Sequence, residues 1–268
     1  MHSTIQQYLQ TLAIDRQLTG LDLVTQIIKR HLATLPFSSI NPLLKQPLSL
    51  ELDQIGQRLL TDKTGGYCYE HHKLLFEALE HLGFEVQRLN ARVLLKSDNG
   101  PRTHRTTLLH WQDKQWLLDV GFGISTPRIP IPLNGESVHD NDRRYFIEPS
   151  AHNGFTLMWQ HDDQDAQPLY RFDLAEVTEA DYQMGHFYCS QYPESAFTQH
   201  LVVSKLSHHH RYLLRHLAFS QTDLRTGKVE ESYITDAEQL RQVLKQSFDL
   251  HVSKEQAKAL FVSQYRME

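Results

Sequence analysis

Cysteine is scarce in this chain of 268 residues, which contains only Cys68 and Cys189. Because these two residues lie far apart in the sequence, they form neither a CxxC redox pair nor a cysteine knuckle for a metal. Basic residues are also in deficit, since 27 Lys and Arg face 32 Asp and Glu, which gives a formal net charge of -5 at pH 7. This balance gives no support to the clustered basic footprint of a nucleic-acid-binding protein, and we expect no nucleic-acid partner.

Long hydrophobic runs are lacking as well. The apolar stretches fall far short of the roughly 20 residues that cross a membrane, and the first residues carry neither the basic nor the apolar region of a secretory signal. We therefore expect a cytoplasmic protein without a membrane partner. The composition, with 40% hydrophobic and 22% charged positions, is typical of a soluble globular protein of one or two domains.

Several common catalytic motifs are missing. The sequence has no GxSxG elbow, no Walker A loop and no HExxH, and Gly121-Phe122-Gly123 lacks the third glycine of a dinucleotide fingerprint. These absences remove the usual signatures of serine hydrolases, nucleotide-binding proteins and zinc proteases. Chemistry therefore has to be sought in individual residues.

Hydrophobic periodicity predicts helices in the first third of the chain. Apolar residues recur at helical spacing over 5–12, 24–32, 52–59 and 75–82, with Ser49 as a possible N-cap and Gly83 as the stop of the last helix. Residues 35–42 are expected to form an ordered loop, because Pro36 and Pro42 do not fit a helix interior.

The period changes to two after residue 83, which predicts strands. These are a long strand over 84–95, a hairpin of 104–111 and 115–122 around Gln112-Asp113, a loop or edge strand over 127–132, and strands over 145–147, 155–159, 169–172, 201–203 and 212–219. Thr178 and Asp181 resemble a capping box for a short helix through Tyr188, and residues 236–248 are expected to form a closing helix.

Cys68 is the residue that points most clearly to chemistry. It follows Gly65 and Gly66, which allow a sharp backbone turn, and it stands at the predicted start of a helix. At that position the unpaired backbone N–H groups and the positive end of the helix dipole stabilise a thiolate, the reactive form of cysteine. The alternative is a small buried residue that only packs.

A thiolate nucleophile needs a base, and the base needs a group that orients it. If Gln112-Asp113 is the turn of the hairpin, Asp119 lies opposite Thr106 and leaves the same face as His104. A three-residue turn instead places the two side chains on opposite faces. Apolar neighbours favour burial of Asp119, and a buried carboxylate needs a partner such as His104. The alternative is a solvated aspartate and a surface histidine.

The chain has 17 histidines, so most of them take no part in chemistry. His71 and His72 could support Cys68 electrostatically, but a surface position is the favoured interpretation. The three histidines at 208–210 invite a metal site, yet on a hairpin they cannot all face one ion, and we expect no metal. Cys189 has no base near it in the sequence, and we expect it to pack.

Taken together, these segments resemble the arylamine N-acetyltransferase family. The matching segments are Leu35-Pro36-Phe37-Ser38-Ser39-Ile40-Asn41 for the family's PFEN(L)N loop, Gly65-Gly66-Tyr67-Cys68-Tyr69-Glu70 for its RGGYCFE motif, Leu82-Gly83-Phe84 and Ala91-Arg92-Val93 for LGF and ARV, Arg102-Thr103-His104 for its histidine strand, and Leu118-Asp119-Val120-Gly121-Phe122-Gly123 for DVGFG. Their order and spacing are collinear with the family through about residue 130. The later match is weaker and consists of Pro193-Glu194-Ser195-Ala196-Phe197 and Arg211-Tyr212.

The resemblance implies an α+β fold of three parts. These are an N-terminal helical bundle over 1–83 that carries the nucleophile, a central β-barrel over 84–195 that carries the histidine and the aspartate, and a C-terminal α/β lid over 196–268. It also implies a catalytic core like that of cysteine proteases, with Cys68, His104 and Asp119 as the triad. The argument from the residues reaches the same three positions.

The resemblance also implies the reaction and its partners. Acetyl-CoA would acylate Cys68, and an arylamine, arylhydrazine or N-hydroxyarylamine would then take the acetyl group in a ping-pong cycle. By the same analogy Phe37, Val93 and Phe122 line the acceptor pocket and Gly123 lets CoA approach the backbone, although Phe37 and Val93 could equally be core residues. The expected partners are CoA and a small aromatic amine or hydrazine, and a homodimer is a further expectation.

Two positions depart from the family pattern. Thr64 stands where the family has the arginine before the glycines, and Ser38 stands where it has the glutamate of the PFEN loop. Because both are replaced together, we expect these positions to face one another.

Two other functions stay open. One keeps the triad but changes the donor or the acceptor, as in an amide-forming acyltransferase that acts on a biosynthetic intermediate, or an amidase-like cysteine hydrolase that delivers the acyl group to water. The other is a binding protein on a former enzyme scaffold, against which the intact Cys68, His104 and Asp119 argue.

Overall fold

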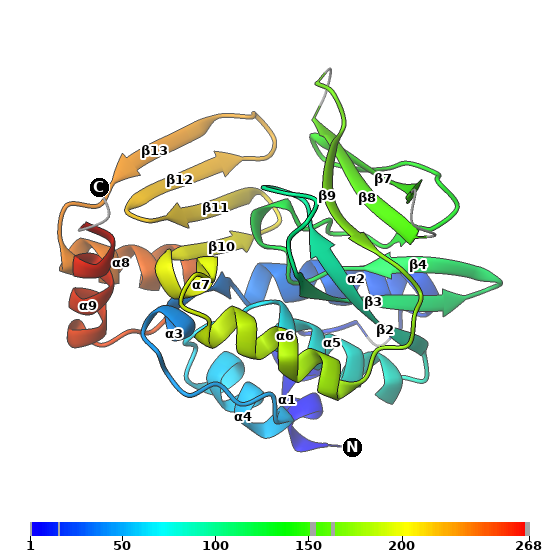
Figure 1. The fold of residues 1–268 in the computed structure, drawn as a ribbon, viewed down its shortest axis with the longest axis horizontal. Coiled ribbons are helices and arrows are strands. Elements are labelled where there is room, and N and C mark those ends of the chain that lie inside the picture. The colour runs from blue at the N-terminus through cyan, green and yellow to red at the C-terminus, as the bar shows by residue number, and fades with distance from the viewer. Residues whose placement is uncertain (1, 16, 151–153, 162–163, 266–268) are drawn as a thin grey trace.

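The structure, a computed structural model, describes residues 2–15, 17–150, 154–161 and 164–265 (Figure 1). Figure 1 shows the N-terminal helices along one side of the molecule, with two β-sheets side by side above them. Within the described residues, no helix is both long and apolar enough to cross a membrane.

The N-terminal third is helical, as its periodicity predicts. Its elements are α1 (Ser3–Thr11), α2 (Gly20–Thr34), α3 (Ile40–Leu43), α4 (Leu52–Gly56), the π-helical turn η1 (Gln57–Thr61) and α5 (Cys68–His81). Apolar residues at helical spacing, such as Val24, Ile27 and Ile28 of α2, pack into one hydrophobic core. Helix α5 ends at Gly83, whose left-handed φ of 84° suits a C-terminal glycine.

Two details of this region correct the sequence-based expectations. Residues 35–42 are not a loop throughout, because they contain strand β1 (Phe37–Ser38) and the start of α3. Pro42 fits there because it lies in the first turn of α3, where backbone N–H groups have no helical acceptor. Ser49 does not cap a helix; its hydroxyl accepts from the N–H of Glu51, which is the actual N-cap of α4.

The middle of the chain forms an antiparallel eight-stranded sheet that curves into a nearly closed barrel. Its strand order is β5-β4-β3-β2-β9-β8-β7-β6. The strands are β2 (Glu85–Val93), β3 (Arg102–Trp111), β4 (Lys114–Leu118), β5 (Ile131–Pro132), β6 (Val138–Asp140), β7 (Arg143–Ser150), β8 (Gly154–His161) and β9 (Gln167–Phe172). Their inward side chains, including Leu108, Leu117 and Tyr145, share one core.

The predicted hairpin is confirmed, but its second strand is shorter than expected. Trp111 pairs with Lys114 across Gln112 and Asp113, which both have positive φ, as a two-residue turn requires. Strand β4 stops at Leu118 rather than near residue 122. The reason is local, because the N–H of Gly121 turns back onto the Asp119 carboxylate at 2.8 Å instead of bonding to a neighbouring strand.

The second sheet has the order β1-β10-β11-β12-β13, so it begins with a strand from the N-terminal third. The remaining elements are the 3-10 turn η2 (Gly123–Ser125), α6 (Glu179–Gln191), α7 (Ala196–Gln199), β10 (Val202–Leu206), β11 (His210–Arg215), β12 (Ala218–Asp223), β13 (Val229–Tyr233), α8 (Ala237–Phe248) and α9 (Lys254–Tyr265). The capping box of Thr178 and Asp181 at the start of α6 is confirmed.

The expectation of a single strand over 212–219 is wrong. The chain turns at His216 and Leu217, which join β11 to β12, and His216 has a left-handed φ of 55°. Neither residue belongs to the usual turn formers, so the sequence carries no signal for this turn. Strand β13 and helix α9 were not expected either, because every residue of β13 is exposed and its sequence lacks the alternation of a half-buried strand.

Contacts between distant segments tie the three parts together. Strand β1 pairs with β10, and α6 buries Tyr182 and Cys189 in the core of the N-terminal helices. These contacts join residues on either side of the expected boundaries between the three parts, at residues 83 and 195. The division of the chain at these boundaries stays a prediction. The contacts also bring the start of α5, the strand β3 and the end of β4 to one place.

Candidate active site

Cys68 is the first residue of α5 and follows a tight turn. Gly65 has a φ of 76°, which favours glycine, and the N–H of Tyr67, the N-cap residue, donates to Glu70 Oε2 at 3.2 Å. The Cys68 side chain is only 2% exposed, and its Sγ lies 3.6 Å from the Thr103 carbonyl oxygen. The sequence therefore places a buried cysteine at a helix N-terminus, as predicted.

A buried ion pair stabilises this turn. Arg58 Nε lies 2.9 Å from Glu70 Oε1, and the Glu70 side chain is fully buried. Burial raises the pKa of Glu70, and the Arg58 charge opposes that rise. The charge beside the nucleophile turn thus comes from Arg58 in η1.

Thr64 and Ser38, the two departures from the family pattern, lie on either side of Gly65. The Asn41 side chain donates to the Gly65 carbonyl at 3.0 Å and lies 3.5 Å from the Thr64 hydroxyl. Ser38 is fully buried against Gly65, and its hydroxyl accepts from the N–H of Ile40. Both hydroxyl groups therefore have hydrogen-bond partners at this turn.

The barrel hairpin brings His104 and Asp119 together. Strand β3 carries His104, and Asp119 follows the last residue of β4. The two-residue turn puts both side chains on the same face, and His104 Nε2 lies 2.8 Å from Asp119 Oδ2. The geometric prediction of a diagonal pair is confirmed, and the alternative of a solvated aspartate with a surface histidine is wrong, because both residues are buried.

The Asp119 carboxylate accepts four hydrogen bonds. Oδ2 accepts from His104 and from the Tyr170 hydroxyl at 2.8 Å, while Oδ1 accepts from the Gly121 N–H at 2.8 Å and lies 3.1 Å from His72 Nε2. Burial alone would raise the pKa of Asp119, but His104 and His72 together hold it far below its usual range. Asp119 is therefore a fixed, ionised carboxylate.

His104 is the charged member of the site. Because its Nε2 bonds to Asp119, the other ring nitrogen is left for Cys68, whose side chain is close enough to raise the pKa of His104. Burial by itself lowers the pKa of His104, but Asp119 and Cys68 outweigh it and raise that pKa to about 10. An imidazolium between a carboxylate and a sulfur is the arrangement that keeps a cysteine in its nucleophilic form.

Of the residues expected to bind the acceptor, Phe122 lies beside this imidazole and Val93 lies beside Tyr170. The Phe122 ring centroid is 5.0 Å from that of His104 and 5.0 Å from that of Tyr170. Val93, which is half-buried, pairs with Tyr170 across β2 and β9, so their side chains leave the same face of the sheet. The structure thus gathers Phe122 and Val93 around Tyr170.

Phe37 and Gly123 lie together on another side of the site. A Cβ on Gly123, which has a φ of 78°, would lie 3.5 Å from Ser204 Oγ and 4.0 Å from a ring carbon of Phe37. The Phe37 ring packs edge to face on Phe197 at 5.7 Å, and Phe197 in turn contacts Tyr67. Phe37 is therefore largely a packed side chain with one side next to Gly123.

The expectation that His71 and His72 lie on the surface is wrong, since both are fully buried. His71 Nε2 donates to the Gly66 carbonyl at 3.1 Å, so its Nδ1 accepts from His31 Nε2 at 2.7 Å, and His31 Nδ1 accepts from the Tyr8 hydroxyl. Burial lowers the pKa of His71 to about 4 and that of His31 well below its usual value. Neutral imidazoles thus link α1 and α2 to the nucleophile turn.

Tyr170 and His72 are the contacts of Asp119 that sequence reasoning missed. His72 carries a usable signal, because it lies four residues after Cys68 and hence on the same side of α5. Tyr170 carries none, since it comes from a strand far along the chain and its position depends on closure of the barrel. Both residues are fully buried.

Cys189 packs near the nucleophile, as expected. Its Sγ also lies 3.6 Å from the Thr103 carbonyl oxygen, and both cysteines are free and buried. Burial, with a smaller contribution from Cys68, raises the pKa of the Cys189 thiol well above its usual value. Cys189 is thus held as a neutral thiol.

One group in the described part of the chain has the ligand spacing of a metal site, namely His72, His104 and Asp119, whose donor atoms lie within 4.8 Å of one another. The four donors around Asp119 use both of its oxygens, and His104 is held as an imidazolium. A proton-holding network explains this donor set without an ion.

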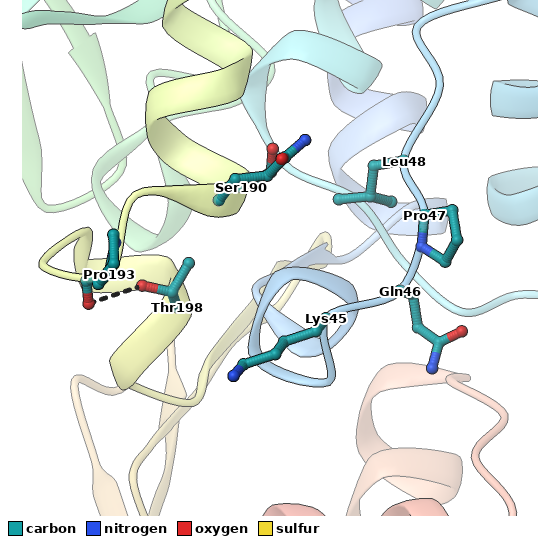
Figure 2. A pocket seen from close by; sticks show the side chains of 8 residues that line it. Lys45, Gln46, Pro47, Leu48, Ser190, Pro193 and Thr198 are labelled. Carbon is teal, nitrogen blue, oxygen red and sulfur yellow. Dashed lines mark hydrogen bonds between the residues drawn. The ribbon is translucent and has the colours of Figure 1, made fainter.

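A cavity of about 540 Å³ lies behind the nucleophile turn, between the α3–α4 connection and the end of α6 (Figure 2). Lys45, Gln46 and Leu48 form one wall, and Ser190, Pro193 and Thr198 form the opposite one. His186 connects one wall of this cavity to the nucleophile turn, because its ring contacts both the Leu48 carbonyl and the Tyr67 hydroxyl. None of the residues expected to be catalytic lines it.

Comparisons with known proteins agree with this geometry. The model of the N-acetyltransferase family matches residues 20–257. The arylamine N-acetyltransferase of Escherichia coli K12 is 30% identical over 244 residues, which are 87% of this chain and 83% of that protein. The arylamine N-acetyltransferase / N-hydroxyarylamine O-acetyltransferase of Salmonella typhimurium is 31% identical over 226 residues, covering 83% and 80%.

Solved structures show the same fold. The arylamine N-acetyltransferase structure from Salmonella typhimurium superposes with a TM-score of 0.90 at 27% identity and covers 98% of this chain and 99% of that one. The Mycobacterium marinum enzyme in complex with CoA superposes with a TM-score of 0.88 at 23% identity, covering 96% and 98%. The α+β fold inferred from the sequence is confirmed, and the chain belongs to the arylamine N-acetyltransferase family of acyltransferase enzymes.

Proposed function

We propose that this enzyme moves an acetyl group from acetyl-CoA to an arylamine, an arylhydrazine or an N-hydroxyarylamine through a thioester on Cys68. The observation that carries the proposal is the buried contact series of Cys68, His104 and Asp119. The names of the relatives support the acceptors, and the CoA in the Mycobacterium marinum structure supports the donor.

The first half-reaction acylates Cys68. The thiolate attacks the acetyl carbonyl carbon, the C–S bond to CoA breaks, and the departing CoA sulfur takes the proton from His104. The backbone N–H of Cys68 is available to the developing oxyanion, because the first N–H groups of a helix have no intrahelical acceptor. Asp119 holds the imidazole in place and offsets its charge while the proton is present.

The second half-reaction releases the product. The acceptor nitrogen attacks the thioester carbonyl and passes its proton to the now neutral His104, while Cys68 leaves as a thiolate. The starting pair of thiolate and imidazolium is thereby restored. An aromatic amine suits this step because it is largely neutral at pH 7, whereas an aliphatic ammonium would have to lose a proton and its hydration first.

The remaining roles follow from position. Phe122, which lies beside His104 and Tyr170, Val93, which pairs with Tyr170, and Phe37 would contact the acceptor ring, and Gly123 would leave space for CoA to approach the backbone. The homodimer and the cytoplasmic location stay predictions.

Steady-state kinetics test the proposal directly. With acetyl-CoA and an aromatic amine as varied substrates, a ping-pong cycle gives parallel double-reciprocal lines, and acetyl-CoA alone gives a burst of free CoA equal to one enzyme equivalent. Phe122→Ala should raise KM for the amine more than it changes the CoA burst.

Three outcomes would overturn parts of this proposal. Intersecting lines without a burst would contradict the thioester. Steady CoA release without an amine would favour a hydrolase that delivers the acyl group to water. Preferred acetylation of lysine would contradict the aromatic acceptor class.

A further inference from the structure

Asp119 lies between two imidazoles, and only one of them faces the nucleophile. His104 binds Oδ2, whereas His72 lies 3.1 Å from the other oxygen, Oδ1. His72 stands one turn after Cys68 on α5 and is fully buried. Its ring therefore contacts the Asp119 carboxylate and packs edge to face on the His104 ring, with centroids 5.9 Å apart.

The proton on the His72 ring can be assigned from its neighbours. A carboxylate only accepts hydrogen bonds, so the nitrogen that faces it, Nε2, carries the proton. Nδ1 then accepts from the Thr107 hydroxyl at 3.0 Å. The Val120 N–H also lies 3.2 Å from Nε2, which would favour the other tautomer, but the bond to a charged oxygen is about twice as strong as one between neutral groups.

We propose that His72 is a positioning residue for acetyl transfer, because it fixes the Asp119 carboxylate so that Oδ2 stays directed at His104. Without it, the Gly121 N–H alone would hold Oδ1. The inference rests on the roles proposed above for Cys68, His104 and Asp119.

His72 suits this role because it stays neutral. Burial is the main reason that the pKa of His72 falls to about 4, even though Asp119 opposes the change. His72 therefore donates a hydrogen bond without taking the negative charge away from His104. The other titratable groups around the two rings are Tyr170 on β9, Arg105 on β3, and His71 and Cys68 on α5; Cys189 on α6 interacts with Cys68.

Two substitutions separate the contacts of this ring. Glutamine places its amide nitrogen as many bonds from Cβ as histidine places Nε2, so His72→Gln keeps a donor toward Asp119. Asparagine places its amide oxygen at the reach of Nδ1, where it can accept from the Thr107 hydroxyl, and its side chain ends one bond short of Nε2, so His72→Asn keeps the Thr107 contact and loses the Asp119 contact. Both variants remain polar and neutral.

The readout is the pH at which His104 loses its proton, followed by the NMR shift of its ring C–H and assigned by comparison with His104→Ala. His72→Asn should lower this His104 midpoint by about one unit, since a tenfold weaker hold on the His104 proton is one unit. It should also lower kcat by about 10- to 100-fold, with little change in KM for the amine. His72→Gln should keep the wild-type midpoint.

A control separates positioning from loss of stability. Gln264 is fully buried in the C-terminal part, where it accepts from the Leu201 N–H at 2.9 Å, so Gln264→Met should lower stability without moving the His104 midpoint. An unchanged or higher midpoint in His72→Asn, or equal shifts in the Asn and Gln variants, would overturn the inference. Failure of wild-type Cys68 to react at neutral pH would instead overturn the proposed triad.

Discussion

Two histidines in opposite protonation states share one carboxylate in this site. Burial lowers the pKa of both, but His104 also faces Cys68 and is raised to about 10, whereas His72 stays near a pKa of about 4. For His104 the Asp119 carboxylate, with a smaller contribution from Cys68, outweighs burial, whereas for His72 burial prevails over Asp119 and the charges of His104 and Arg105 lower the pKa further. Asp119 can therefore support a charged base without being neutralised by its second partner.

The two cysteines should differ strongly in reactivity. Cys68 lies next to an imidazolium, whereas burial raises the pKa of Cys189 and keeps it a thiol. Iodoacetamide at neutral pH should label Cys68 at least tenfold faster, and Cys68→Ala should remove both labelling and transfer without unfolding the protein. Timed peptide mass analysis would measure the two rates, and equal rates would contradict an activated Cys68.

Asp119→Asn should slow acylation by about three to four orders of magnitude, as the same change does in serine-protease triads. The amide carries no charge to hold the His104 imidazolium, and its NH₂ group would meet the donors that now point at the carboxylate. The single-turnover rate of CoA release measures the effect, with circular dichroism to check the fold. Near-normal release from a folded variant would show that Asp119 is not part of the machinery.

Sequence reasoning reached Cys68, His104 and Asp119 because each depends on local features. A glycine turn before a helix, a two-residue hairpin and a carboxylate among apolar residues can all be read along the chain. Tyr170 could not be found in this way, because its contact with Asp119 depends on how β9 closes the barrel beside β2.

At the scale of elements, the site depends on how closely the end of β4 approaches the start of α5. A Cβ on Gly121 would lie only 2.7 Å from the Cys68 Cα and 3.2 Å from a ring carbon of His72. The chain after Leu118 can therefore approach α5 this closely only if residue 121 is glycine. The two-residue turn sets the register of β3 and β4. A shift of that register by one residue would turn the Asp119 side chain away from His104.

Gly121→Ala should accordingly impair activity more than an ordinary glycine replacement does. The added methyl group must displace the backbone at Cys68, and we expect kcat/KM to fall by at least 10-fold together with a lower Tm. Gly100→Ala is the matched control, because the nearest atom to its Cβ is 3.9 Å away. Equal activity of the two variants in an acetyl-transfer assay would contradict the close approach.

At the scale of the whole molecule, the chain has three hydrophobic cores and buried hydrogen-bond networks of histidines and Asp119. The helical bundle, the barrel and the second sheet each have their own core, and neutral histidines link α1, α2 and α5 behind the nucleophile. The broad order of helices and strands was predictable from periodicity. The division of 212–219, the strand β13 and the helix α9 were not, because their turns and faces carry weak local signals.

These histidines predict how stability depends on pH. His31, His71, His72 and His186 have lowered pKa values, chiefly through burial, so the unfolded chain binds more protons below its usual histidine pKa of 6.5. Stability should therefore fall as the pH drops from 6.5 toward 4. The raised pKa of His104 acts in the opposite direction, since its contribution is complete below 6.5 and is lost as the pH rises through 10.

Thermal unfolding should therefore give the highest Tm near pH 6.5, with each kcal/mol lost on either side lowering it by about 2–4 °C. His31→Leu should be less stable at pH 7 and show a shallower decline toward pH 4, because one titrating group is gone. The exposed His81 offers a control, and His81→Gln should keep the wild-type slope. A Tm that is flat between pH 6.5 and 4 would contradict the neutral buried histidines.

The most direct test of the account is to locate the acetyl group on the enzyme. After incubation with acetyl-CoA and removal of free donor, peptide mass analysis should find one acetyl group on Cys68, none on Cys189, and complete loss of that group when an aromatic amine is added. An acetyl group on Cys189, or one on Cys68 that the amine does not remove, would contradict transfer through the Cys68 thioester.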